Sequence, residues 1–291
     1  MRTIIMSSSN IVGTGNNTLV YDIPTSATFR DDYIAVASVA IYYSWFNISA
    51  ELGNNTFSYR WDSVGGTTDI TIPDGLYEVS TLNDFLQSEF IRLGHYLVED
   101  ATQQNVYFGE FIVNPAQYVV QINTYSIPTA VPVGYTAGTP LTFPRTTLQT
   151  LGITLGSGLG TLLGFTGANL TINPVLALPQ FTQESFQSNV SPNIQPNSTV
   201  LISVDGVDNP YASPTGVIYA FSPNVGIGEI IIEKPPQLCW VRIREGQARQ
   251  LTLRLLGSAN NAPLKIQDPA MTIILAIADE QEALGFKRSV K

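Results

Sequence analysis

Alternating apolar and polar positions mark strands along most of this chain. The longest run begins at Asp32 and continues to Ile48, and both of its faces are apolar over the first ten residues. A strand that is apolar on both faces must be covered on both sides, by a second sheet or by neighbouring subunits. The run therefore predicts a large β-structure in which a second sheet or another subunit packs against this strand.

Shorter alternating runs predict further strands, separated by turn residues such as Pro73-Asp74-Gly75. Pro24 is expected to end the first of them. The predicted strands cover residues 18–23, 56–61, 69–72, 106–113, 118–125, 199–204, 216–221, 238–244, 250–256 and 271–278. The predicted strands number more than the eight of a simple two-sheet core, so extra hairpins or a small insertion must be added to that core.

One helix is predicted between Ser80 and Leu93. Ser80 or Thr81 can cap it, and Gly94 can end it. The apolar residues at helical spacing are Leu82, Phe85, Leu86, Phe90 and Leu93. His95 follows directly and is expected to interact with the helix C-terminus or to lie in solvent.

Length and charge narrow the class of protein. The 291 residues reach the upper size of one all-β domain, so a single domain over residues 1–291 is predicted. The net charge of −9 repels a phosphate backbone, and direct nucleic-acid binding is not expected. Only 13% of the residues are charged, about half of the ~25% usual for soluble domains. A surface this poor in charge is typical of subunit interfaces.

The segment from Phe111 to Gln183 contains one charged residue, Arg145. A long, irregular and apolar segment lies either over its own core or between subunits, and we favour the second because long ordered loops are usually functional. Within it, Leu148 to Leu170 is long enough to span a membrane. Its six glycines lower its hydrophobicity and helix propensity, so no membrane span is predicted.

Residues that could support catalysis or hold a metal are scarce. One histidine and one cysteine exclude, within one chain, a multi-histidine metal site and a disulfide. The run Gly156 to Gly160 resembles a dinucleotide loop, but Thr161 replaces its third glycine. Asp205 to Asn209 is read as a turn whose side chains bond its own backbone, in preference to a calcium loop. We therefore predict no catalytic, cofactor-binding or metal residues, and no enzymatic activity.

An arginine group near the C-terminus is the candidate contact site. Alternation places Cys239, Val241 and Ile243 on the inner face of a strand. The residues that face outward on this strand and the next are Trp240, Arg242, Arg244 and Arg254. Together with Arg145, they are the possible subunit contacts. In an acidic chain they suit a neighbour that carries carboxylates. The alternative is a solvated sheet face with arginine stems over Trp240.

The order of these elements resembles the penton (minor capsid) proteins of virophages, of the mavirus and Maverick/Polinton type. Besides the long strand, the motifs are Ile72-Pro73-Asp74-Gly75-Leu76-Tyr77, Leu82-Asn83-Asp84-Phe85-Leu86-Gln87 and Leu162-Leu163-Gly164-Phe165. The resemblance implies a single jelly-roll β-sandwich of two four-stranded antiparallel sheets. It also implies homopentamers at the five-fold vertices of an icosahedral virion, assembled inside the host cell beside a major capsid protein. Some relatives insert a domain into the jelly roll, and here a Pro/Gly/Thr-rich loop or a small insertion is expected at about residues 126–197.

Two other classes remain open. A jelly roll for glycan binding or host attachment would need aromatic and acidic residues around a sugar, and Tyr211 beside Asp205 and Asp208 is the candidate. A glycosidase would need paired carboxylates on neighbouring strands. The predicted strands contain few acids, Glu110 being an exception, so the enzyme class ranks last.

Overall fold

The computed structural model describes residues 1–61, 66–139, 143, 148–283 and 285, apart from the side chains of residues 24–27. The chain forms two compact units: unit 1 comprises residues 1–46 and 196–291, and unit 2 comprises residues 47–195. The structure thus differs from the single domain expected over residues 1–291. The proposed insertion at 126–197 is only the second half of unit 2, because strands 56–60 and 152–155 pair with each other inside that unit.

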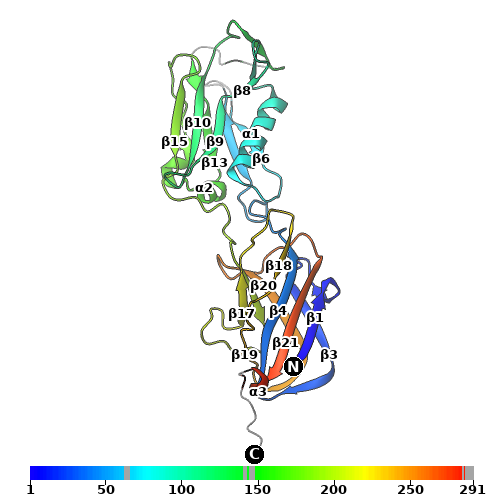
Figure 1. The fold of residues 1–291 in the computed structure, drawn as a ribbon. Helices are drawn as coiled ribbons and strands as arrows, with labels where there is room; N and C mark the ends of the chain where they lie inside the picture. The colour runs from blue at the N-terminus through cyan, green and yellow to red at the C-terminus, as the bar shows by residue number, and fades with distance from the viewer. Residues whose placement is uncertain (62–65, 140–142, 144–147, 284, 286–291) are drawn as a thin grey trace, which may run out of the picture. The chain divides into compact units, whose positions relative to one another are not determined.

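Unit 1 consists of two antiparallel sheets (Figure 1). The first has the order β1 (Arg2–Ser7), β21 (Met271–Asp279), β4 (Asp32–Tyr42) and β18 (Ile230–Glu233), and β19 (Val241–Arg242) also pairs with β4. The second has the order β17 (Val217–Phe221), β16 (Val200–Val204), β20 (Gly246–Gly257), β3 (Thr18–Phe29) and β2 (Ile11–Val12). The 3-10 helix η1 (Ser8–Asn10) and the helix α3 (Glu280–Ala283) flank these strands.

The strand order of unit 1 is that of a jelly roll. Numbered along the chain, the main strands β1, β3, β4, β16, β17, β18, β20 and β21 have the order 1-8-3-6 in one sheet and 5-4-7-2 in the other. Successive strands change sheet except the fourth and fifth, which pair with each other. The predicted all-β, jelly-roll class is confirmed for this unit, in which each sheet has a fifth strand, β19 or β2, beside the four expected.

The core of unit 1 lies between the two sheets. Met6, Ile273 and Val39 are adjacent in register across β1, β21 and β4, and all three are fully buried. The second sheet contributes Leu253 and Leu255, which are fully buried as well. The alternation predicted for residues 250–256 therefore describes the inward face of β20 correctly. The last strand, predicted to be apolar on both faces, is β21, which buries Ile273 between the sheets.

The first predicted strand is longer than expected. β3 continues through Pro24 to Phe29, and the register of its partner β20 shifts between Ala248 and Gln250. Proline cannot donate a ladder hydrogen bond and is tolerated where a strand is irregular. The strand therefore passes through Pro24 with a local break in pairing, and does not end there.

Unit 2 is also rich in β-structure (Figure 1). One sheet has the order β14 (Thr171–Ile172), β13 (Gly152–Leu155), β5 (Thr56–Arg60) and β6 (Thr68–Thr71). A second has β10 (Val119–Ile127) paired with β9 (Gly109–Asn114), β15 (Gln183–Gln187) and β12 (Gln149–Thr150). A third consists of β11 (Tyr135–Ala137), β7 (Leu97–Glu99) and β8 (Asn105–Val106). Short helices are α2 (Ser157–Leu163) and η2 (Gly167–Leu170).

The predicted helix is confirmed as α1 (Val79–Leu93), which packs against β9. Leu82, Leu86 and Phe90 are its buried residues at helical spacing. It starts slightly earlier than expected, with Glu78 as the N-cap, and Gly94 ends it at φ 73°. Glycine favours this left-handed conformation because it has no Cβ.

The expected environment of His95 is wrong. Its Nδ1 lies 2.8 Å from the Tyr59 hydroxyl, and its ring stacks on Trp61 with centroids 4.5 Å apart and planes 2° from parallel. Burial lowers the pKa of His95 to about 4, so the imidazole is neutral at pH 7. The residue therefore packs as a neutral aromatic partner and carries no charge for the helix dipole.

The segment from Phe111 to Gln183, which has a single charged residue, supplies much of the core of unit 2. Val120, Ile122, Leu151 and Leu163 are all fully buried there. The placement between subunits that we favoured is therefore wrong for these side chains, because packing within the unit explains the missing charge. No helix among the described residues is long and apolar enough to cross a membrane.

Candidate subunit interface

The arginine group predicted as a contact site has carboxylate partners within the chain. Arg145 lies outside the described residues. Arg254 on β20 donates two hydrogen bonds to the two carboxylate oxygens of Asp205, the second at 2.9 Å. Arg244 lies 3.8 Å from Asp208, which follows Asp205 in the same turn. The turn that was considered for calcium thus pairs with arginine.

Arg242 on β19 has different partners. Its guanidinium lies 2.7 Å from Asp31 and 2.9 Å from Glu245. These side chains are all more than half exposed, and surface ion pairs of this kind contribute about 0–1 kcal/mol. The arginines therefore form local ion pairs and do not present a row of unpaired positive charge.

Two neighbouring predictions also need correction. Cys239 is exposed, although it was expected in the core. Trp240 is half-buried, whereas alternation placed it outward. The reason is that β19 contains only Val241 and Arg242, so the strand alternation does not extend back to residue 239.

A second surface, which we call the outer sheet face, lies on the first sheet of unit 1, on the side away from Met6, Val39 and Ile273. Ile5 pairs with Ile274 across β1 and β21. Ala40 of β4 pairs with Ile232 on one side and with Thr272 on the other. The full set is Thr3, Ile5, Ser7, Thr272, Ile274, Ser38, Ala40, Tyr42, Ile230 and Ile232.

The outer sheet face is uncharged and partly apolar. Ile5, Ile230 and Ile232 are 59%, 41% and 58% exposed. Large aliphatic side chains gathered in this way on a sheet are typical of a binding surface, whereas isolated exposed ones are common. The face can therefore bind an apolar surface of matching shape.

Part of this surface could be anticipated. The apolar character of both sides of the Asp32 run predicted a cover on each side, and the second sheet covers only one of them. The contribution of β18 was missed, although Ile230-Ile231-Ile232 is a β-branched run that alternates between exposed, buried and exposed.

The site considered for glycan binding near Tyr211 is not supported by the geometry. Tyr211 is almost fully exposed, and Asp205 is engaged by Arg254. Among the described residues, no group of three His, Cys, Asp or Glu side chains could hold a metal ion.

Comparison with known proteins finds a likeness among solved structures. No protein-family model and no curated protein matches the chain. Fifteen solved chains match, among them one described as the crystal structure of SeMet-labelled mavirus penton protein. The two share 10% identity at a TM-score of 0.40, over 94% of this chain and 97% of that chain. The resemblance seen in the sequence is thus found again in the structural comparison.

Proposed function

We propose that this chain is a structural capsid protein, a penton that forms homopentamers at the five-fold vertices of an icosahedral virion beside a major capsid protein. The observation that carries the proposal is the outer sheet face of a jelly-roll unit. The face has exposed isoleucines and no charged residue. A second copy of the chain is the occupant we assign to it.

Ring formation accounts for this surface. An apolar patch lowers solubility unless it is covered, and a cyclic assembly covers it on every copy without leaving an open end. Burying one isoleucine side chain contributes about 1.5–3 kcal/mol. Three exposed isoleucines on the face therefore provide a driving force for association, in a chain with few charges to oppose it.

The experiment compares Ile232→Asp with Val133→Asp in the full chain. Both replace an exposed aliphatic residue by aspartate, but Ile232 lies in the outer sheet face and Val133 lies in unit 2. We expect Ile232→Asp to lose rings in negative-stain images and to be excluded from co-expressed capsid shells, whereas Val133→Asp behaves as the parent does. Equal assembly of both variants would contradict this use of the face.

A further inference from the structure

Unit 2 contains a half-open pocket of about 350 Å³ that the proposed capsid role does not use. Its size falls within the range of small-molecule sites, ~300–1,000 Å³. The residues that matter for its chemistry are Gln87 of α1, Tyr107, Glu110 of β9, Tyr125 of β10, Tyr135 of β11 and Phe181. All of them belong to unit 2.

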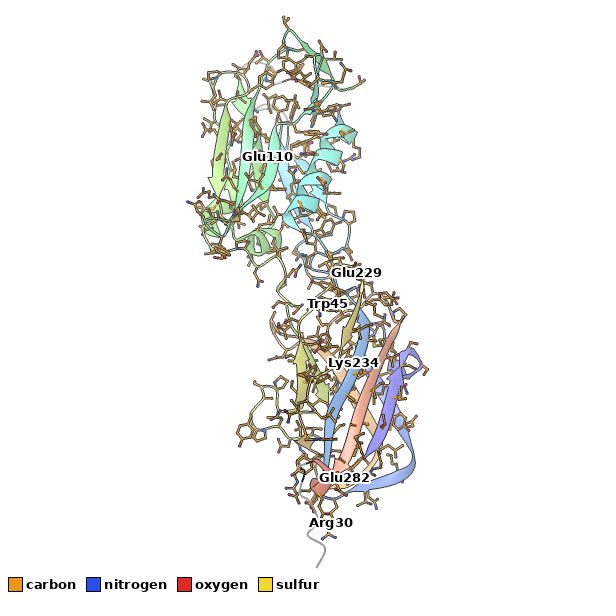
Figure 2. The ribbon with its side chains drawn as sticks, in the orientation of Figure 1. Arg30, Trp45, Glu110, Glu229, Lys234 and Glu282 are labelled. Carbon is orange, nitrogen blue, oxygen red and sulfur yellow. The ribbon has the colours of Figure 1, made fainter. Side chains whose placement is uncertain are left out.

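Glu110, labelled in Figure 2, is held in place by its neighbours. The Asn123 side-chain amide and the Tyr125 hydroxyl each donate a hydrogen bond to Glu110 Oε1 at 2.7 Å. Among the described residues, no group donates to the other carboxylate oxygen, Oε2. This oxygen is therefore available to accept a hydrogen bond from a ligand.

The support for Glu110 extends across three strands. Asn123 of β10 is the register partner of Glu110 on one side and of Ser185 on the other. The Gln121 amide and the Ser185 hydroxyl donate to Asn123 Oδ1 at 2.7 Å and 2.8 Å, which fixes the orientation of the amide. A polar side chain fixed by such a network is pre-organised for binding.

Aromatic side chains form the rest of the pocket. The rings of Tyr135 and Phe181 are in contact, with centroids 5.2 Å apart. Burial, followed by the bond to Glu110, raises the pKa of Tyr125, so its hydroxyl stays protonated and keeps donating. The Tyr107 hydroxyl accepts from Asn105 at 3.0 Å and retains its own proton to donate.

The composition of the pocket decides the class of ligand. No basic side chain is among the described residues that line it, so nothing there would neutralise a phosphate, sulfate or carboxylate. Tyrosine combines an apolar ring face with a polar tip, and it can contact the C–H face of a sugar while bonding a hydroxyl. An ammonium ligand would use Glu110 and the rings but would leave the Gln87 amide and the proton of the Tyr107 hydroxyl unused.

We infer that this pocket binds a neutral saccharide, with Glu110 Oε2 accepting from a ligand hydroxyl and Gln87 bonding a second hydroxyl from the helix side. The inference is independent of the proposed capsid role. A capsid protein with such a pocket would carry its own means of attachment to a glycan.

The test is direct binding to the full-length chain. A glycan array and NMR titration with glucose, galactose, mannose and N-acetylglucosamine would identify a neutral ligand, with 3′-sialyllactose and tetramethylammonium as ionic probes. We expect Glu110→Gln and Gln87→Ala to weaken binding at least tenfold. Gln87→Ala leaves the Glu110 network intact, and Glu184→Gln, an acid on β15 that does not line the pocket, is the matched control.

Three outcomes would overturn the inference: no neutral sugar bound at millimolar concentration, binding by Glu110→Gln and Gln87→Ala as tight as that of the parent, or preference for tetramethylammonium. Ring formation by the same variants is expected to match that of the parent. Loss of sugar binding in a variant that still forms rings would therefore show an effect on the pocket alone. Failure of the parent to form rings would contradict only the proposed capsid role.

Discussion

The side-chain amide of Asn47 donates a hydrogen bond of 2.7 Å to the backbone carbonyl of Ile194, so the two ends of unit 2 are joined directly. The same amide nitrogen donates to the Tyr77 carbonyl at 2.7 Å, and the Tyr77 amide donates back to Asn47 Oδ1 at 2.8 Å. Both amide hydrogens of Asn47 are therefore used. A small contact thus closes unit 2, whose residues 47–195 follow β4 and precede β16 in the sequence.

We expect Asn47→Ala to lower the free energy of unfolding of unit 2 by about 1–3 kcal/mol, because it leaves partly buried backbone groups without partners. Urea denaturation followed by tryptophan fluorescence measures this change. Asn193→Ala, a change at an exposed asparagine near the same end of the unit, is the control and should alter stability little. Similar stability of the two variants would show that the Asn47 bonds do not hold the ends of unit 2 together.

The stability of unit 2 should depend on pH through His95. Because burial holds the pKa of the folded imidazole at about 4, below its ordinary 6.5, the unfolded chain takes up a proton in this interval that the folded chain does not. The contribution of neutral His95 to the free energy of unfolding is therefore fully present above about pH 6.5. It falls as the pH drops towards about 4 and changes no further below that pH. Allowing for partial exposure of the ring, the loss is on the order of 1–2 kcal/mol.

His95→Phe tests this dependence, because phenylalanine can still stack on Trp61 but cannot take up a proton. Urea denaturation of both proteins between pH 7 and pH 4 should show the parent losing stability relative to the variant. Parallel curves over this interval would mean that protonation of His95 is not linked to unfolding.

The double variant Arg242→Ala with Arg244→Ala separates a subunit contact from a local role. Because both arginines pair with exposed carboxylates of their own chain, we expect rings to form as in the parent and stability to fall by about 1 kcal/mol or less. Analytical ultracentrifugation of the two proteins at equal concentration checks this. Loss of assembly without loss of folding would instead assign these arginines to the interface, as the sequence first predicted.

Elements with strong local patterns could be predicted from the sequence. The strand beginning at Asp32, the final strand beginning at Met271 and the helix α1 all have a clear period of apolar residues, and the structure contains each of them. Because each of these elements is buried on one side or on both, its apolar residues recur at the period of a strand or a helix, and this spacing is visible among neighbouring residues in the sequence. The same signal predicted the all-β class.

Features that depend on distant residues were not predictable in this way. The boundaries of unit 2 bring Asn47 near Ile194, and no local pattern connects positions so far apart in the chain. The role of Glu110 depends on its register with Asn123 and Ser185 across three strands. The helix α2 was obscured by glycines with low helix propensity, one of which, Gly160, lies close to the Leu170 side chain, which would have to shift if a Cβ were added.

The mass of the purified parent protein in solution tests the central claim most directly. Light scattering over a range of concentrations, with negative-stain images of the same sample, measures the number of copies in the assembly. We predict a particle of about five times the chain mass of 31.6 kDa that appears as a five-fold ring. A protein that stays monomeric at high concentration and forms no rings would contradict the account.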